Sequence, residues 1–572
     1  MNIKRYILSI LITFLLLITS QCPCLGASTN QISQFGITWT FDRQYEYGRF
    51  ANGDYWVVGP VTVININPAS SEAGGRVING SMINPSPRLG STQGYDSSMF
   101  GVYGPNYNAG LNAARPGNRA LSSSNPLIVQ PSSSLVSTIS MPDAGHRPQL
   151  KTAAVLTVLQ ASPPAGSFRP PYVNVSKGIR FNKSQLDYSK LLRLAPAGNV
   201  PRLKQNAGDS QSASVERMFE RPWLDHIPEW MNRYHHPADN LPDYGREIST
   251  QVGIAALMLN LNYSNDEKET LLIRFVQLGI DLYGIVQDGG EDNWVNNGGH
   301  ASGRKFPILF AGVMLNDYGM RSIGQRSGDY LYASGHGPGN EPPDYVHFGE
   351  DDQTFFVTQL EINISHSAAW DPDDRADELI PYSQGDIGLP EWGIREASYP
   401  EANNKYWGAG YRRCCTAISW AGFTLAARAM GLKALWNHEA LFDYMDRYMQ
   451  VTAEGGVCPG YRQSSRFVEN MWDTYRADYG QIWIMGDPYG GYSNVYDINE
   501  GGGGGTAYIP GDVSGNGEVS SYDASLAAQY AISMIALDPE QVQAADVSGN
   551  SEVSAYDASL IAQYAIGLID HF

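Results

Sequence analysis

The chain has 572 residues, of which 42% are hydrophobic and 11% aromatic, including 34 Tyr and 12 Trp. This hydrophobic share excludes a disordered polymer, and the length suggests about three domains. The formal net charge of −19 argues against a nucleic-acid partner, because phosphates are bound by Lys and Arg. The aromatic content suits sugar contacts as well as core packing, since Tyr and Trp combine a flat apolar face with a polar tip.

Residues 1–27 are predicted to be a secretory signal peptide. Lys4 and Arg5 precede an apolar stretch from Tyr6 to Thr19, and small residues follow up to Ala27. The apolar stretch is too short to span a membrane comfortably, and no longer apolar run follows it. We therefore expect an exported protein with no transmembrane anchor after signal cleavage.

Residues 28–205 are predicted to form an all-β, sandwich-like module. Short β-prone runs alternate with Gly, Pro and Asn turn signals, and the clearest runs are Ile37–Phe41, Tyr55–Asn65 and Ala153–Leu159. The polar stretch from Leu194 to Ser214 is predicted to be a linker.

Residues 215–495 are predicted to form a mainly α, α/α-toroid-like domain. Apolar residues recur there at three- and four-residue steps, which predicts helices. The predicted helices are Arg246–Leu261, Glu267–Val286, Lys305–Leu315, Asp351–Ile362, Cys414–Met430 and Leu435–Met449. Long loops rich in Gly, Asn, His and Trp separate them, and long loops in a compact domain are usually functional. This domain is therefore the candidate catalytic domain.

The cysteines left after signal cleavage are odd in number. Cys414, Cys415 and Cys458 remain, so at least one thiol is unpaired or forms an intermolecular bond. We expect a disulfide between Cys458 and one member of the adjacent pair.

The tail contains an internal repeat behind a flexible tether. Residues 496–509 are predicted to be a linker, because the run Gly501–Gly505 cannot pack. In residues 510–572, the segment from Asp512 to Leu526 recurs from Asp546 to Leu560. Each copy is predicted to continue into a short helix, Ala527–Met534 in the first and Ile561–Leu568 in the second.

Each copy of the repeat carries the oxygen pattern of a calcium loop. Calcium takes six to eight oxygens, which a loop supplies at alternating positions and at its twelfth residue. The predicted ligands are Asp512, Ser514, Asn516, Glu518, Ser520 and Asp523, then Asp546, Ser548, Asn550, Glu552, Ser554 and Asp557, with Glu518 and Glu552 acting through their backbone carbonyls. The sequence therefore predicts two bound Ca²⁺ ions. The second loop has Ser551 at the turn position where the first loop has Gly517, so we expect the second site to bind calcium more weakly.

These loops, each followed by a helix and ending in Asp, resemble the type I dockerin family. The resemblance implies a small calcium-dependent helical fold that docks onto a cohesin module of a scaffold or surface protein. It also implies that partner choice depends on the residues before the last loop ligand, which are Ser521, Tyr522, Ala555 and Tyr556. Because the two copies are nearly equivalent, docking in two orientations is expected.

The dockerin resemblance implies a protein located outside the cell, in a cellulosome or held at a surface through a scaffold. Dockerins occur mostly on enzymes that degrade polysaccharides. We therefore expect a secreted, carbohydrate-active enzyme, with a non-catalytic glycan-binding or structural protein as the alternative.

The upstream loops offer two kinds of catalytic chemistry. A polysaccharide lyase must neutralise a uronate carboxylate and remove the adjacent proton, for which the candidates are Tyr244, Asn297, His300 and Arg304. A glycoside hydrolase needs two facing carboxylates, for which the candidates are Asp239, Asp243, Glu247, Glu291, Asp344 and Asp351. The lyase is slightly favoured, because His, Asn and Arg gather in one loop. The candidate substrate-binding residues are Trp294, Trp407, Tyr411 and Arg412.

Structural roles compete with each of these assignments. Glu247 and Asp351 lie at predicted helix starts, where a carboxylate simply favours the helix dipole. His300 could be a satisfied loop histidine, and Arg412 could pair with a carboxylate. The pair His235-His236 could bind zinc, but no third ligand stands at a recognisable spacing.

Overall fold

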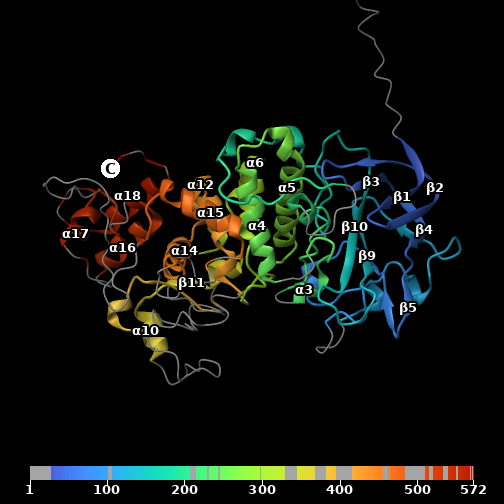
Figure 1. Cartoon of the computed structure of the whole chain (residues 1–572), viewed down its shortest axis with the longest axis horizontal. Helices are drawn as coiled ribbons and strands as arrows, with labels where there is room; N and C mark the ends of the chain where they lie inside the picture. The colour runs from blue at the N-terminus through green and yellow to red at the C-terminus, as the bar shows by residue number, and fades with distance from the viewer. Residues whose placement is uncertain are drawn as a thin grey trace, which may run out of the picture.

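The computed structural model describes most of the chain. Outside the described residues lie 1–26, 101–105, 207–213, 229–230, 242–244, 297, 329–343, 367–381, 394–411, 413–414, 455–461, 463, 484–508, 515–518, 533–536, 538, 549, 551, 567 and 570. The predicted signal peptide is thus almost wholly outside them. Figure 1 shows strands in the N-terminal part, helices in the middle and three short helices near the C-terminus. The mainly β N-terminal region, the central helical region and the small helical C-terminal module are thereby confirmed.

The N-terminal strands form one eight-stranded sheet that bends at its longest strand. The strands are β1 Ser28–Gln34, β2 Ile37–Arg49, β3 Tyr55–Val58, β4 Val61–Asn67, β7 Ser81–Ile83, β8 Leu127–Val129, β9 Ser133–Ser140 and β10 Leu150–Leu159, while β5 Ser71–Ala73 and β6 Arg76–Ile78 form a separate ribbon. β4 pairs with the first half of β2, β1 pairs with both halves across an irregularity, and β3 pairs with the end of β2. β3 pairs in parallel with β10, which pairs antiparallel with β9.

The two halves of the bent sheet face each other over a shared core. Trp39 on β2 is buried and donates from Nε1 to Ser137 Oγ on β9 at 2.9 Å. Leu135 and Leu156 belong to this core, whereas the neighbouring residues Val136 and Val155 belong to the core of the helical region. Side chains alternate across a strand, so β9 and β10 are buried on both faces. The helical region therefore packs directly on the outer face of β9 and β10.

The predicted strand Tyr55–Asn65 is two strands in the structure. β3 ends at Val58 and β4 begins at Val61, with Gly59 and Pro60 between them. Pro60 cannot donate a ladder hydrogen bond, and a methyl group on Gly59 would lie 2.2 Å from Val158 Cγ1. These two residues end one strand and allow the next to turn away.

The central region is built from helices of uneven length. They are α2 Val215–Met218, α3 Asn232–His235, α4 Arg246–Leu259, α5 Asn265–Gln287, α6 Lys305–Met314, α7 Tyr318–Arg321, α9 Gly349–Asp352, α10 Gln359–Ser365, α12 Ala421–Ala429, α13 Lys433–Trp436, α14 Glu439–Val451 and α15 Arg466–Tyr475. α5 begins at a capping box in which Ser264 and Glu267 bond each other's backbone N–H. α4 and α12 approach closely at glycines, since a methyl group on Gly253 would lie 2.9 Å from Gly422 Cα.

Two predicted helices are each interrupted in the structure, for different reasons. The predicted helix Asp351–Ile362 is α9, the strand β11 Thr354–Phe356 and α10, and β11 pairs with β12 Pro390–Trp392. Thr and Phe favour strands, and pairing with a distant segment outweighs the helical spacing. The predicted helix Leu435–Met449 breaks at Asn437, whose φ of 59 places it in the left-handed region between α13 and α14.

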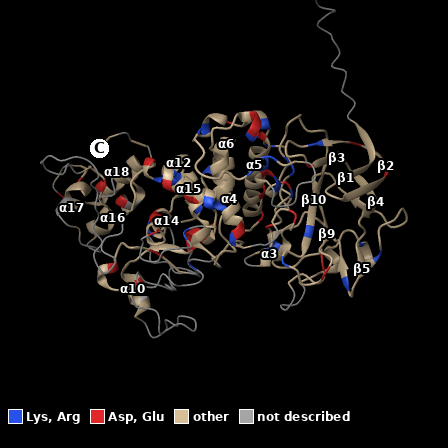
Figure 2. Cartoon of the chain, viewed as in Figure 1, with Lys and Arg blue, Asp and Glu red and all other residues tan. Residues whose placement is uncertain are grey.

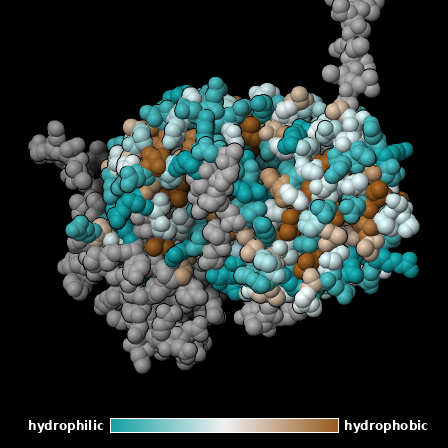
Figure 3. All heavy atoms as spheres, turned by 45° about the vertical axis from the view of Figure 1, so that its right-hand side comes forward, coloured by the Kyte–Doolittle hydropathy of each residue, from teal (hydrophilic) through white to brown (hydrophobic). Residues whose placement is uncertain are grey.

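None of the described helices is long and apolar enough to cross a bilayer. Figure 3 shows hydrophobic residues in small groups among hydrophilic ones on the face that carries the β-rich part. Small dispersed groups of this kind are usual on a folded protein.

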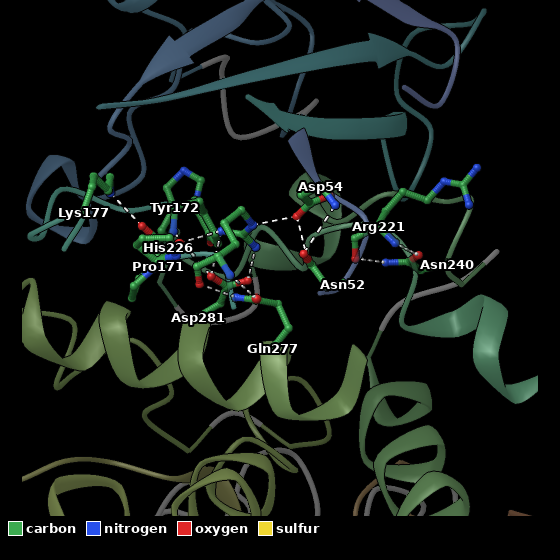
Figure 4. A network of polar contacts seen from close by, with 12 residues as sticks. Asn52, Asp54, Pro171, Tyr172, Lys177, Arg221, His226, Asn240, Gln277 and Asp281 are labelled. Atoms are coloured by element: carbon green, nitrogen blue, oxygen red, sulfur yellow. Dashed lines mark hydrogen bonds and ion pairs between the residues drawn. The ribbon is translucent and has the colours of Figure 1, made fainter. Parts of the chain in front are cut away.

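One buried arginine, Arg169, joins the β-rich part to the helical part, and Figure 4 labels its partners Asp54, Gln277 and Asp281. Arg169 Nε donates to Asp54 Oδ2 at 2.6 Å, and its two terminal nitrogens donate to the carboxylate of Asp281 on α5 at 3.0 and 2.5 Å. Gln277 on α5 exchanges two hydrogen bonds of 3.0 Å with the Arg169 backbone. All three charged side chains are almost completely buried. Burial raises the pKa of Asp281 to about 6 despite the adjacent guanidinium.

We expect Arg169→Leu to destabilise the upstream region strongly, because it leaves two buried carboxylates without a cation. Removing one partner of such a cluster costs about 3–5 kcal/mol. Arg180→Leu is the matched control, because its 2.8 Å pair with Asp317 leaves the guanidinium 52% exposed and is worth at most about 1 kcal/mol. Thermal unfolding followed by circular dichroism measures both, and equal losses would contradict the role assigned to Arg169.

Candidate functional site

The loop between α5 and α6 carries three of the four candidate catalytic residues, Asn297, His300 and Arg304, and Tyr244 precedes α4. His300 is partly exposed and faces the start of α4. A methyl group on Gly245 would lie 3.3 Å from His300 Nδ1 and 3.6 Å from Glu247 Oε2, so both side chains border the same point. Tyr244 and Asn297 lie outside the described residues, so the structure describes two of the four predicted catalytic residues, His300 and Arg304.

Arg304 and Trp294 lie in the interior, on opposite ends of that loop. Both bond Asp225, with Arg304 Nε at 2.8 Å and Trp294 Nε1 at 2.9 Å from Asp225 Oδ2. All three residues are fully buried. Their burial favours a supporting role over contact with a substrate. Asp225 was missed in the sequence, because a single carboxylate between apolar neighbours carries no local signal of its partners.

Arg412, a candidate substrate-binding residue, is also buried. Its Nη2 lies 3.1 and 3.2 Å from the two carboxylate oxygens of Glu391. Glu391 also accepts from Arg447 Nη1 at 2.7 Å and from the Tyr382 hydroxyl at 3.1 Å. The carboxylate pairing considered for Arg412 is therefore present. Trp407 and Tyr411 lie outside the described residues.

The carboxylates considered for a hydrolase differ in how far they are exposed to solvent. Asp351 is buried between Lys305 and the indole N–H of Trp436. Glu247 stays partly exposed beside Arg246 at the start of α4, and Asp344 is 72% exposed. Asp243 lies outside the described residues. Cys415 is disulfide-bonded, and its partner lies outside them as well.

The adjacent His235 and His236 lie in a buried aromatic cluster instead of a solvent-facing site. The His235 ring lies 4.4 Å from the His226 ring and 4.9 Å from the Tyr95 ring, measured between centroids. His235 Nδ1 bonds the Leu224 carbonyl at 2.8 Å. Within the described part of the chain, no group of three or more His, Cys, Asp and Glu side chains is arranged to hold a metal ion.

Burial makes these imidazoles sensitive to acid. It lowers the pKa of His235 to about 4 and the pKa of His226 well below its ordinary value. Between the unfolded value near 6.5 and about 4, the unfolded chain binds more protons than the folded one. Stability from His235 is therefore complete above pH ~6.5 and falls as the pH drops to ~4, by up to ~3 kcal/mol.

We expect His235→Asn to unfold at a lower temperature at neutral pH but to lose less stability between pH 7 and pH ~4.5 than the wild type. Asn keeps an N–H for Leu224 and removes the titrating ring. Buried carboxyls with raised pKa values, such as Asp281, gain stability as the pH falls, but they are present in both proteins. The difference between the two pH profiles, measured by thermal melts, therefore reports His235 alone. His146→Asn, at a 43% exposed histidine, should leave the wild-type profile unchanged. Parallel profiles for His235→Asn and the wild type would refute the assignment.

The tail folds as three short helices around its own small core. The helices are α16 Ser521–Ala531, α17 Pro539–Ala545 and α18 Ala555–Ala565, so α16 and α18 start earlier than predicted and α17 was not predicted. The core includes Val513, Ala527 and Ile561. Gly511 has a φ of 89 and lies so close to Phe572 that a methyl group would come within 2.5 Å of its ring. The two ends of the module therefore meet.

In each predicted calcium loop, the first and last carboxylates converge on one serine. The Ser514 N–H donates to Asp523 Oδ1 at 2.7 Å, while its hydroxyl donates to Asp512 Oδ1 at 3.3 Å. The second loop repeats this arrangement, with distances of 2.9 Å from the Ser548 N–H to Asp557 and 3.4 Å from its hydroxyl to Asp546. The described residues thus bring each pair of carboxylates to one side of its loop.

The last carboxylate of each loop also starts the helix that follows. Asp523 Oδ2 accepts from the N–H and the hydroxyl of Ser520 at 2.8 and 2.7 Å. Asp557 and Ser554 repeat this as a capping box. Burial raises the pKa of Asp557, but hydrogen bonds from Ser548 and Ser554 outweigh it and hold the pKa below its ordinary value. The loop carboxylate is therefore ionised at neutral pH.

The residues of these loops fit calcium. Asp523 and Asp557 are completely buried, and the module from 510 onward has nine Asp and Glu but neither Lys nor Arg. Figure 2 shows acidic but no basic residues on the described parts of α16 and α18. Buried ionised carboxylates need a compensating cation, and hydroxyl, amide and carboxylate oxygens are the ligands of a hard divalent ion. Asn516 and Glu518 lie outside the described residues, whereas Asn550 and Glu552 are exposed in the second loop.

The predicted partner-binding residues stand at the starts of α16 and α18. Ser521 and Ala555 are exposed, and the Tyr556 side chain is 63% exposed. The side chain of Tyr522 lies outside the described part. The three described positions are thus accessible to a partner.

We expect Asp557→Asn to weaken one of the two calcium sites by about tenfold or more, because it removes a charged ligand. Glu552→Gln is the matched control, since it removes one negative charge from the same loop but keeps the backbone carbonyl ligand. Calorimetric titration of the full chain should show two sites of unequal affinity in the wild type. Equal effects of the two variants would show that net charge, and not ligation, controls binding.

Comparison with known proteins agrees with this geometry. Residues 510–565 match the family model of the dockerin type I domain. No curated protein and no solved structure matched the chain. Type I dockerins are calcium-binding modules that dock onto cohesins. The C-terminal module is therefore a type I dockerin domain, which indicates docking to a cohesin, as a component of a cellulosome-type assembly.

Proposed function

We propose that this chain is a secreted polysaccharide-degrading enzyme, carried by its dockerin to a cohesin on a scaffold or surface protein. The observation that carries the proposal is the dockerin domain behind a large, separately folded upstream region. A module that only addresses a protein to an assembly implies that the rest of the chain supplies the activity. Polysaccharide is the substrate class most often associated with such a module.

Within this proposal, a lyase is favoured over a hydrolase. His300, as the base, removes the proton next to the uronate carboxylate, Tyr244, as the acid, protonates the departing glycosidic oxygen while the double bond forms, and Asn297 binds the carboxylate. His300 fits because it is partly exposed and lies near the carboxylate of Glu247, at the start of α4. Arg304 and Trp294 stabilise the loop and do not contact the substrate, because both are buried and both donate hydrogen bonds to Asp225.

The remaining parts of the proposal concern the organisation of the chain. Residues 1–27 act as the signal peptide, 28–205 as the β-rich module, 215–495 as the catalytic, α/α-toroid-like domain, 496–509 as the linker and 510–572 as the dockerin. The two loops of the dockerin each hold one Ca²⁺ ion. Trp407, Tyr411 and Arg412 contribute to substrate binding, with Arg412 acting through its bond to Glu391.

Two alternatives make different predictions. A hydrolase would release reducing ends without forming a double bond, and Glu247 and Asp344 are candidate carboxylates that stay accessible to solvent. A non-catalytic glycan-binding protein would retain the sugar without turnover.

We expect the purified full chain to act on a polyuronate in a panel of acidic and neutral polysaccharides, forming the unsaturated product that ultraviolet absorbance detects. His300→Ala should lower the rate by about 10²–10⁴-fold if His300 transfers the proton. His146→Ala, at an exposed histidine on the β-rich part, is the control and should keep full activity. Reducing ends without ultraviolet absorbance would favour the hydrolase, and binding without product would favour the glycan-binding protein.

A further inference from the structure

The candidate catalytic loop, residues 296–303, is held along its length by one short segment, residues 349–353. Four hydrogen bonds connect the two: Asn296 N–H to Asp352 Oδ2 at 3.3 Å, Gln353 Nε2 to Gly298 O at 2.9 Å, Gly349 N–H to Ala301 O at 3.3 Å and Gly303 N–H to Glu350 Oε2 at 2.9 Å. The bonds reach both ends and the middle of the loop. The segment therefore acts as a template for the loop backbone.

The three template side chains are buried. Glu350, Asp352 and Gln353 are at most 2% exposed. Gln353 Nε2 also donates to Gly349 O at 2.7 Å, so one amide ties the template to itself and to the loop. Water has little access to replace these bonds, and a lost bond leaves a loop N–H or C=O unsatisfied.

The flanks of the loop are attached to the same part of the chain. Trp294 stacks on Phe348, with ring centroids 5.7 Å apart and an interplanar angle of 11°. Lys305, the first residue of α6, pairs with Asp351 inside the template. The loop is thus fixed immediately before and after the four bonds.

The four hydrogen bonds join the template to backbone groups of the loop, and the His300 side chain borders Gly245, just before α4. His300 lies between two residues whose backbone the template holds, Gly298 and Gly303. A fixed backbone with one partly exposed imidazole is the arrangement that presents a side chain at a defined place.

We propose that Glu350 and Gln353 are positioning residues, which hold the loop backbone so that His300 is presented beside the start of α4. This inference rests on the proposed function, in which His300 transfers a proton. Glu350 contributes an acceptor oxygen for Gly303 N–H, and Gln353 contributes a donor for Gly298 O. Neither needs to touch the substrate.

Hydrogen–deuterium exchange of the full chain tests the positioning directly. We expect Glu350→Ala and Gln353→Met to speed exchange of the loop peptide by about tenfold, the effect of losing one buried hydrogen bond. Glu350→Gln is the matched control, because its amide oxygen still accepts from Gly303. Exchange in the α5 peptide should stay at the wild-type rate in all three variants, which separates local loosening from unfolding.

Kinetics on the polysaccharide identified by the panel provides the second measurement. Loosening of the loop should lower kcat more than it raises KM, and Glu350→Gln should restore kcat. Unchanged loop exchange in both Glu350→Ala and Gln353→Met overturns the inference, as does loosened exchange with wild-type kcat. If the wild type degrades no polysaccharide, the proposed function fails, and loop exchange alone decides whether the template holds.

Discussion

The upstream region depends on the burial of one guanidinium between two carboxylates. Arg169 can be buried only because Asp54 and Asp281 accept its donors, and those two residues belong to the β-rich part and to α5. A charge cluster that bridges two parts of a protein fixes their relative orientation, because a small shift would strand a charge in the interior. The apolar core continues around it, from Val136 and Val155 on the sheet into the helices. The sheet is thus the base on which the helical region is built.

The upstream region and the C-terminal module provide different partners for their buried carboxylates. Asp225 is paired with Arg304, and Glu391 is paired with Arg412 and Arg447. The dockerin has no Lys or Arg at all, so the described donors to Asp523 and Asp557 are neutral ones, such as those of Ser520 and Ser554. The two parts of the chain thus differ in how their buried carboxylates are satisfied, by paired arginines upstream and by backbone and hydroxyl donors in the tail.

The candidate site combines a rigid backbone with few exposed reactive groups. His235 and His236 are buried in the aromatic cluster around His226 and Trp223, whereas His300 remains partly exposed. The buried network around Asp225 and the template at residues 349–353 hold the loop of His300 from two sides. Such a loop can keep a proton-transferring group in place without contributing many groups of its own.

What the sequence by itself determined is local. The calcium ligands lie within twelve consecutive residues, so their spacing alone identifies the loops, and the dockerin assignment followed from them. The helices α4, α5 and α6 were predicted to within about two residues at each end, because apolar periodicity and caps are also local signals. Tertiary structure decided the partners of Arg169, Arg304 and Arg412, and it turned Thr354–Phe356 into a strand. These outcomes depend on contacts between residues far apart in the chain, and no pattern in a single sequence states which distant carboxylate or strand will meet a given side chain.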